Sequence, residues 1–306
     1  MITAKTMLYL YVETPLHAGV GSGLSSIDLP IQRERTTQYP MIQGSGIKGK
    51  LRAIAEDVLD DTTVNVLFGS PTTGASDYAG ALVVGDARLL LFPVRALNGV
   101  FAYTTSYDVL NRFQRDIGRE TPSNAPTWKA SLLSPGKALV TTNSHVHMQN
   151  KLVLEECSFE TQSDPQVDEI AQWLAQSAFP DFGNTYWSER IKRSLVILSN
   201  DDFRDFALYA TEVITRVRLD RQSKTVVRGA LWTEEHLPVD TLLYVPIYAT
   251  SARQNNGTSM KAENVLAKVK ALGAGSNNYL QLGGDETVGR GIVRMRWETQ
   301  EAGITI

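Results

Sequence analysis

The order of extended and helical patterns constrains the fold of this chain more than any other sequence feature. Strand-type runs rich in Tyr, Val and Leu occur at 6–13, 81–93 and 242–247, and helical spacing of apolar residues occurs at 47–59. The two kinds of pattern do not alternate with a regular βαβ period, which argues against a doubly wound parallel sheet. The sequence also shows no internal repeat and no Gly/Ser-rich linker. We therefore predict one α+β domain over residues 1–306, with an antiparallel sheet and long insertions.

Residues 214–230 predict an extended β-hairpin with a basic tip. Apolar and charged side chains alternate at 216–220, a polar interruption follows at 221–224, and the strand pattern resumes at 225–227. Five basic residues stand against one acid, Asp220, so the segment carries a net charge of +4. A ribbon with this charge does not pack on an apolar core, and two strands alone are marginally stable. We expect the hairpin to be exposed, mobile in the free protein and ordered by a partner.

A second feature is the stretch 15–52, which combines glycine-rich turns with basic residues. It carries a net charge of +3, whereas the whole chain carries −3. Acidic residues are concentrated instead at 152–181, where there are seven of them and no Lys or Arg. The total charge therefore argues against a uniformly basic nucleic-acid-binding protein but leaves a local binding surface open.

The segment 44–51, GSGIKGKL, matches a phosphate-binding loop except at its last position. Leu51 stands where the motif requires Ser or Thr to hold Mg²⁺, and Pro40 interrupts the strand that would precede the loop. A nucleotide-binding protein of this type is therefore the less favoured alternative. The glycines at 19–23 do not fit the dinucleotide-binding fingerprint and predict a flexible loop.

Asp28 is a lone carboxylate beside that glycine loop. As a structural residue it would cap a turn. As a functional residue it would bind Mg²⁺ or orient an attacking 2′-hydroxyl near a phosphodiester. The neighbouring residues alone favour the structural role and leave the functional one open.

Cysteine content and the N-terminal sequence indicate an intracellular setting. Cys157 is the single cysteine, which excludes an intrachain disulfide framework and a C-x-x-C metal site. The apolar run at 7–12 is too short for the core of a signal peptide or for a membrane span. We expect a cytoplasmic protein with no membrane partner.

Several runs of this sequence are similar to those of one protein family. The runs TPLHAGVGSG, IDLPIQRE and PMIQGSGIKGKLR in the N-terminal part resemble the RAMP superfamily of CRISPR-associated proteins. LLFPVRALNGVFAYTT, GALWTEEHLP and LQLGGDETVGRGIVRMRW resemble, more specifically, the backbone subunits of the type III-B (Cmr) effector. Together the runs extend from Thr14 to Trp297.

This resemblance implies a ferredoxin-like (RRM-type) antiparallel sheet core with large insertions, from which the hairpin at 214–230 extends as a thumb. It implies copies stacked in a helical filament along a CRISPR RNA, together with other Cmr subunits. Target RNA would be cleaved beside each thumb by an endoribonuclease activity that depends on a divalent metal, Mg²⁺ or Mn²⁺. The alternative within the same family is a catalytically inactive RNA-binding scaffold.

The resemblance also assigns residue roles. Asp28 matches the catalytic aspartate and metal ligand, and His17, Glu234 and Glu235 fall in motifs near that site. We find no RNP-type aromatic motif for base stacking, so binding by a backbone clamp is expected. The expected RNA-binding residues are Arg33, Arg35, Lys48, Lys50, Arg52, Arg218, Arg221, Lys224, Gly283, Gly284, Gly289 and Arg290.

Overall fold

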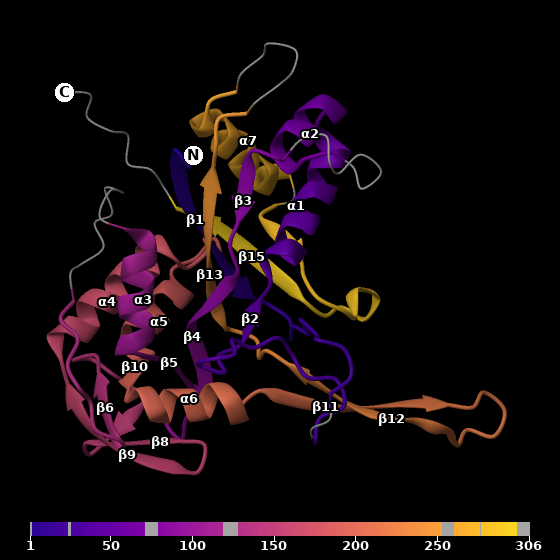
Figure 1. Cartoon of the computed structure of the whole chain (residues 1–306). Coiled ribbons are helices and arrows are strands. Elements are labelled where there is room, and N and C mark those ends of the chain that lie inside the picture. The colour runs from indigo at the N-terminus through magenta and orange to yellow at the C-terminus, as the bar shows by residue number, and fades with distance from the viewer. Residues whose placement is uncertain are drawn as a thin grey trace, which may run out of the picture.

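The computed structural model describes residues 2–23, 26–70, 79–118, 128–252, 260–275 and 277–298 (Figure 1). Within these residues, thirteen strands join one sheet, and two further strands form a separate ribbon. Helices cover the sheet, and none of those described is long and apolar enough to cross a membrane. The predicted α+β class is confirmed, and the sheet is mostly antiparallel.

The first half of the sheet is built around β1 (Ala4–Val12), whose residues Met7 to Val12 are all buried. β1 pairs antiparallel with β13 (Leu242–Ala249) on one side and with β15 (Ile292–Trp297) on the other. β4 (Ala87–Arg95) pairs antiparallel with the far edge of β13, and β14 (Tyr279–Gln281) lies outside β15. The first and last strands of the described chain, β1 and β15, are therefore neighbours in the sheet. The short strands β2 (Met41–Ile42) and β3 (Leu82–Val84) pair with β4 and β13.

The second half of the sheet continues from β4 through β5 (Phe101–Ser106), which returns antiparallel after a turn at Asn98 and Gly99. β10 (Leu195–Leu198) then pairs parallel with β5, and β6 (Lys137–Val140) pairs antiparallel with β10. The remaining strands are β9 (Cys157–Ser163), β8 (Lys151–Leu154) and β7 (His147–Met148), of which β9 runs parallel to β6. The sheet is thus mixed here, which the prediction of an antiparallel sheet did not include.

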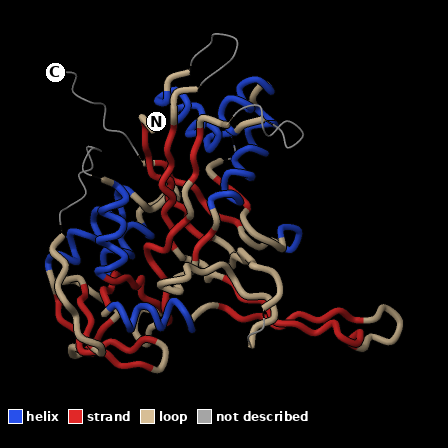
Figure 2. Tube along the Cα trace, in the orientation of Figure 1, coloured by secondary structure: helices blue, strands red, loops and turns tan. Residues whose placement is uncertain are grey.

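Two groups of helices cover the sheet (Figures 1 and 2). The first half of the sheet carries α1 (Gly44–Val58), α2 (Asp61–Phe68) and α7 (Ala262–Gly275). The second half carries α4 (Pro165–Ser177), α5 (Tyr186–Ser194) and α6 (Asn200–Tyr209). α3 (Tyr107–Ile117) also packs on the first half, where its Phe113 ring lies 5.0 Å from the Tyr244 ring of β13. Apolar faces at helical spacing place these helices, as in α3, where Leu110, Phe113 and Ile117 are buried.

The separate ribbon is the antiparallel hairpin of β11 (Glu212–Leu219) and β12 (Val226–His236), which projects far from the body (Figure 1). The predicted hairpin at 214–230 is confirmed but too short, because pairing continues to Glu212 and His236 at its base. Val217, Leu219 and Val226 remain 48–53% exposed along it, so the hairpin is not buried in the protein's own core.

Candidate functional site

The base of the hairpin is where three segments distant in sequence lie side by side. Leu16 forms an antiparallel bridge with Leu237, and Leu29 a parallel bridge with Glu234. The amide of Gly284 donates to the carbonyl of His17 at 3.0 Å. The loop that carries the first glycine cluster (19–23), the loop of the second glycine cluster (283–291) and strand β12 therefore meet at the hairpin base.

Asp28 is held at this surface by Thr233 on β12. Its Oδ2 accepts hydrogen bonds from the Thr233 amide at 2.8 Å and the Thr233 Oγ1 at 2.9 Å, and its own amide donates to the same Oγ1 at 3.0 Å. These bonds, from the Thr233 amide first, lower the pKa of Asp28 below its ordinary value. The side chain is exposed, so it presents an oriented carboxylate to the outside.

His17 lies just before the first glycine cluster and is partly buried. Its Nδ1 is 2.7 Å from the carbonyl oxygen of Glu235, and because a carbonyl only accepts, Nδ1 carries the proton. In the neutral ring Nε2 is then the acceptor. The rings of His17 and His236 lie 5.4 Å apart between centroids.

Glu235 and Arg33 form an internal ion pair rather than part of an exposed site. Glu235 is 3% exposed and accepts from Arg33, from the Ile31 amide at 3.0 Å and from Thr211 Oγ1 at 2.8 Å. Arg33 also donates to the carbonyls of Gln38 and Ala207. These contacts favour a structural role for both residues, joining the loop after Asp28 to the hairpin, over the catalytic and RNA-binding roles expected from the sequence.

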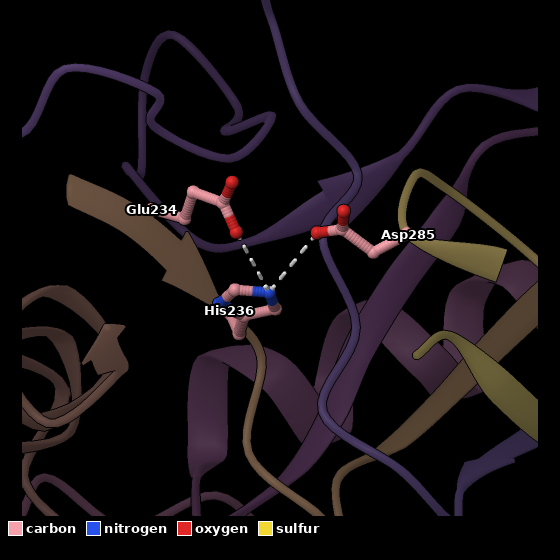
Figure 3. A group of neighbouring side chains, drawn as sticks. All are labelled: Glu234, His236 and Asp285. Carbon is pink, nitrogen blue, oxygen red and sulfur yellow. Dashed lines mark ion pairs between the residues drawn. The ribbon is translucent and has the colours of Figure 1, made fainter. Parts of the chain in front are cut away.

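Glu234, His236 and Asp285 form a second group of ionisable side chains at the hairpin base (Figure 3). His236 Nε2 lies 3.9 Å from Glu234 Oε2 and 3.8 Å from Asp285 Oδ2. Arg216 bridges the two carboxylates, with Nε 2.7 Å from Glu234 Oε2 and Nη2 2.9 Å from Asp285 Oδ2. Trp232 Nε1 donates to the other oxygen of Glu234 at 2.7 Å.

The environment shifts the pKa values of this group. Burial lowers the pKa of His236, with further lowering by His17 and Arg290, and favours the neutral ring. For Glu234, burial raises the pKa, but the hydrogen bonds from Trp232 and Arg216 outweigh it and the net shift is downward. The group thus combines an ionised carboxylate with a neutral imidazole.

Sequence reasoning missed His236, Asp285 and Arg216 as site residues. Glu234 and His236 stand two residues apart on β12, so their side chains share one face of the strand. On β11, Ile214 pairs with Glu234, and Arg216 lies two residues after Ile214, on the same face. This spacing along the two strands was the only feature of the sequence that could have indicated that these side chains lie together. Asp285 comes from the distant glycine cluster, and only the tertiary fold brings it to the strand.

The phosphate-binding-loop alternative is wrong. The motif lies inside α1, which begins at Gly44, whereas such loops place their glycines before the helix. The amide of Gly44 donates to Asp86 Oδ1 at 2.8 Å, so a carboxylate of the protein occupies the helix start where a phosphate was expected.

The basic residues of α1 have partners within the protein. Lys48 Nζ donates to the Leu82 carbonyl at 3.1 Å, and burial, followed by Arg52, lowers the pKa of Lys48. Arg52 donates to the Gly69 carbonyl and pairs with Glu56. Lys50 Nζ lies 3.3 Å from Glu286 Oε2, which connects α1 to the second glycine cluster.

The other expected RNA-binding residues lie on the surface. Arg218, Arg221 and Lys224 are exposed toward the end of the hairpin, and Arg35 is exposed on the loop after β1. Gly283, Gly284 and Gly289 are exposed and Arg290 is partly exposed around the short helix η2 (Glu286–Val288).

Gly283 is expected to be essential for holding His17, and Gly289 provides a matched control. Both have a left-handed backbone, with φ of +79° and +76°, but a Cβ on Gly283 would lie 2.2 Å from the His17 carbonyl oxygen, whereas one on Gly289 meets nothing within 4 Å. Gly289→Ala should cost about 1 kcal/mol of unfolding free energy for the strained backbone. Gly283→Ala should cost at least about 2–3 kcal/mol, because the clash is added. Chemical denaturation measures both, and equal losses would show that the His17 loop moves aside freely.

The chain is similar to known proteins over most of its length. A family model described as the RAMP superfamily matches residues 9–294. The CRISPR system Cmr endoribonuclease Cmr4 of Pyrococcus furiosus is 39% identical over 290 residues, covering 94% of this chain and 93% of that protein. The CRISPR system CMR subunit Cmr4 of Saccharolobus solfataricus is 25% identical, covering 94% and 95%. The crystal structure of oligomeric Cmr4 from Pyrococcus furiosus has a TM-score of 0.71 at 33% identity and covers 97% of this chain and 98% of that one.

Proposed function

Because this chain belongs to the RAMP superfamily, we propose that it is a backbone subunit of a type III-B CRISPR effector and cleaves target RNA as an endoribonuclease. The names of its relatives, a Cmr endoribonuclease and a CMR subunit, support both parts of the proposal. The observation that carries the cleavage role is an exposed, oriented carboxylate, Asp28, at the root of an exposed basic ribbon.

In the proposed reaction, Asp28 accepts a hydrogen bond from the 2′-hydroxyl of the nucleotide before the cut. Because its pKa is lowered, Asp28 is a weak proton acceptor, and we assign it the task of orienting that hydroxyl rather than storing its proton. The 2′-oxygen then forms a bond to phosphorus and passes its proton to water. The bond from phosphorus to the 5′-oxygen breaks, and that oxygen takes a proton from solvent. The products are a 2′,3′-cyclic phosphate and a 5′-hydroxyl.

The order of strands supports a ferredoxin-like core within the larger sheet. β15, β1, β13 and β4 are neighbours in that order, and each adjacent pair is antiparallel. α1 follows β1 and precedes β4, and α7 lies between β13 and β15. We propose that these six elements are the core and that the second half of the sheet is an insertion between β4 and β13.

CRISPR RNA and target RNA are the proposed partners, together with further copies of the chain and other Cmr subunits. A relative at 33% identity is described as oligomeric, which supports assembly of copies. The exposed hairpin, with its charge and its free apolar side chains, has the form expected of a thumb inserted between base pairs.

Asp28 by itself is a poor site for the divalent metal that the family resemblance implies. Among the described residues, the one group of three or more potential ligands is Glu234, His236 and Asp285, and it does not contain Asp28. When bound nearby, a metal would neutralise charge on the phosphate. We propose that Asp28 contributes at most one oxygen to it.

Charges on the hairpin should account for part of the salt dependence of RNA binding. The double variant Arg221→Ala/Lys224→Ala removes two exposed cations and should flatten the slope of log K against log salt by roughly 0.7–0.9 per lost phosphate contact. Arg33→Met is the control. Arg33 is paired with Glu235 inside the protein, so this substitution should lower stability and leave the salt dependence of RNA binding unchanged. An unchanged slope in the double variant would show that the hairpin tip does not meet phosphate.

The assay that tests the proposal is target cleavage by the assembled complex. Wild-type and Asp28→Asn subunits are each reconstituted, and guide binding and cleavage are measured separately. A wild-type complex that binds target without cutting it would favour the inactive scaffold.

A further inference from the structure

A fully buried histidine without hydrogen bonds lies at the base of the hairpin. His236 is 0% exposed, and neither Nδ1 nor Nε2 has a hydrogen-bond partner among the described residues. A buried polar atom left unpaired costs roughly 1–3 kcal/mol, so such an atom requires an explanation. Nε2 points toward the carboxylates of Glu234 and Asp285 (Figure 3).

The three donor atoms are spaced as the ligands of one ion would be before it binds. They all lie within 4.8 Å of one another, and the two distances from His236 Nε2 are 3.9 and 3.8 Å. Two donors on a tetrahedral ion at about 2.1 Å each lie roughly 3.4 Å apart, so a closure of a few tenths of an ångström brings each carboxylate oxygen to ligand distance from His236 Nε2.

One carboxylate, and the backbone that carries the other, are fixed in place by further contacts. Trp232 Nε1 donates to Oε1 of Glu234 and leaves Oε2 directed at His236. The loop that carries Asp285 is closed by the amides of Val288 and Arg290, which donate to the backbone carbonyl of Asp285 at 3.1 and 3.2 Å. The Glu234 side chain and the Asp285 backbone are therefore preorganised.

A cation of the protein already occupies the centre of the group. Arg216, on β11, contacts the oxygens of Glu234 and Asp285 that face His236, at 2.7 and 2.9 Å. The guanidinium neutralises the carboxylates, but His236 Nε2 has no hydrogen-bond partner among the described residues, so a lone pair of the imidazole stays unsatisfied. A metal ion would neutralise the carboxylates and also satisfy that lone pair.

We propose that Glu234, His236 and Asp285 form a binding site for a divalent transition metal, and that Arg216 is the competing cation that fills it when the metal is absent. A nitrogen donor with two carboxylates suits Mn²⁺ or Zn²⁺ better than Mg²⁺, which prefers oxygen ligands. Three protein ligands leave positions open for water or a phosphate oxygen. This inference deepens the proposed function by naming metal ligands, but metal binding itself does not require RNA.

Mn²⁺ binding to the full-length, RNA-free chain tests the inference, with free Mn²⁺ measured by electron paramagnetic resonance. Arg216→Gln removes the competing charge and should bind Mn²⁺ at least tenfold more tightly than the wild type. Arg218→Gln is the matched control, since it makes the same change on the same strand at an exposed position, and its affinity should stay within twofold of the wild type. Mg²⁺ should displace the bound Mn²⁺ only in large excess.

Asp285→Asn provides the second arm, in both the wild-type and the Arg216→Gln chain. Asn tolerates the left-handed backbone at this position, where φ is +60°, so the loop should fold normally. The substitution should weaken Mn²⁺ binding at least tenfold in both chains. The inference is overturned if Arg216→Gln binds no better than Arg218→Gln, or if tight binding survives the loss of Asp285. Either result leaves the cleavage role of Asp28 standing, because cleavage is measured separately.

Discussion

Asp28→Asn is expected to abolish target cleavage by the assembled complex and to leave guide binding intact. The amide has the shape of the carboxylate, and its oxygen can still accept from the amide and Oγ1 of Thr233, so the local fold is retained. The negative charge that orients the attacking hydroxyl is lost. Loss of the orientation of an attacking group can cost roughly 10²-fold in rate, so we expect a loss of at least about that size.

Asp57→Asn is the matched control for this experiment. Asp57 is an exposed aspartate on α1, and the same isosteric change there should leave cleavage and binding at wild-type levels. Single-turnover cleavage of a labelled target measures the rate, and gel retardation of the guide measures binding. A normal cutting rate in Asp28→Asn would show that the bonds to Thr233 are the whole role of this residue.

Shortening the hairpin is expected to change where the target is cut without disturbing the fold. The tip is a local turn, closed by the Asp220 amide on the Thr225 carbonyl at 2.8 Å and the Lys224 amide on the Asp220 carbonyl at 3.0 Å. Replacing 220–225 by Asn-Gly would join Leu219 and Val226, which are already paired, through a tight two-residue turn. Contacts with the protein core are not removed, because the ribbon is a separate sheet.

The consequence for cleavage follows from the position of the hairpin. Asp28 is fixed to β12, so under the proposed function the ribbon would set where RNA lies relative to the carboxylate. A shorter wedge should splay the duplex less, and we expect cuts at regular positions to become fewer or displaced while guide binding persists. A tip of unchanged length but neutral sequence controls for the loss of charge. Cleavage at the same regular positions by the shortened chain would contradict the wedge role.

Local sequence patterns were sufficient for several individual elements. Apolar spacing at 47–59 identified α1, in which Ile47, Leu51 and Ala55 are buried, and alternation identified the hairpin. These features depend on neighbours within a few residues, whose spacing fixes the backbone period and the buried face. The prominence of both glycine clusters was also visible in the sequence, and the resemblance they carry indicated the family.

Tertiary structure alone decided which of these elements and side chains meet. Strands β5 and β10 pair parallel, although they are separated by α3, α4 and α5, and no local pattern specifies such a partner. Asp28 and Thr233 are 205 positions apart, and their contact depends on how the glycine loop packs beside β12.

Tertiary contacts also explain why some residues have a different role from the one expected from the sequence. Arg33 was identified by its charge, but its charge is matched by buried Glu235 in the hairpin base. Asp285 was one letter in a glycine cluster, and it became a candidate ligand because its loop reaches His236. A sequence records which groups can ionise or donate, whereas burial and partners, which fix what those groups do, are properties of the packed chain.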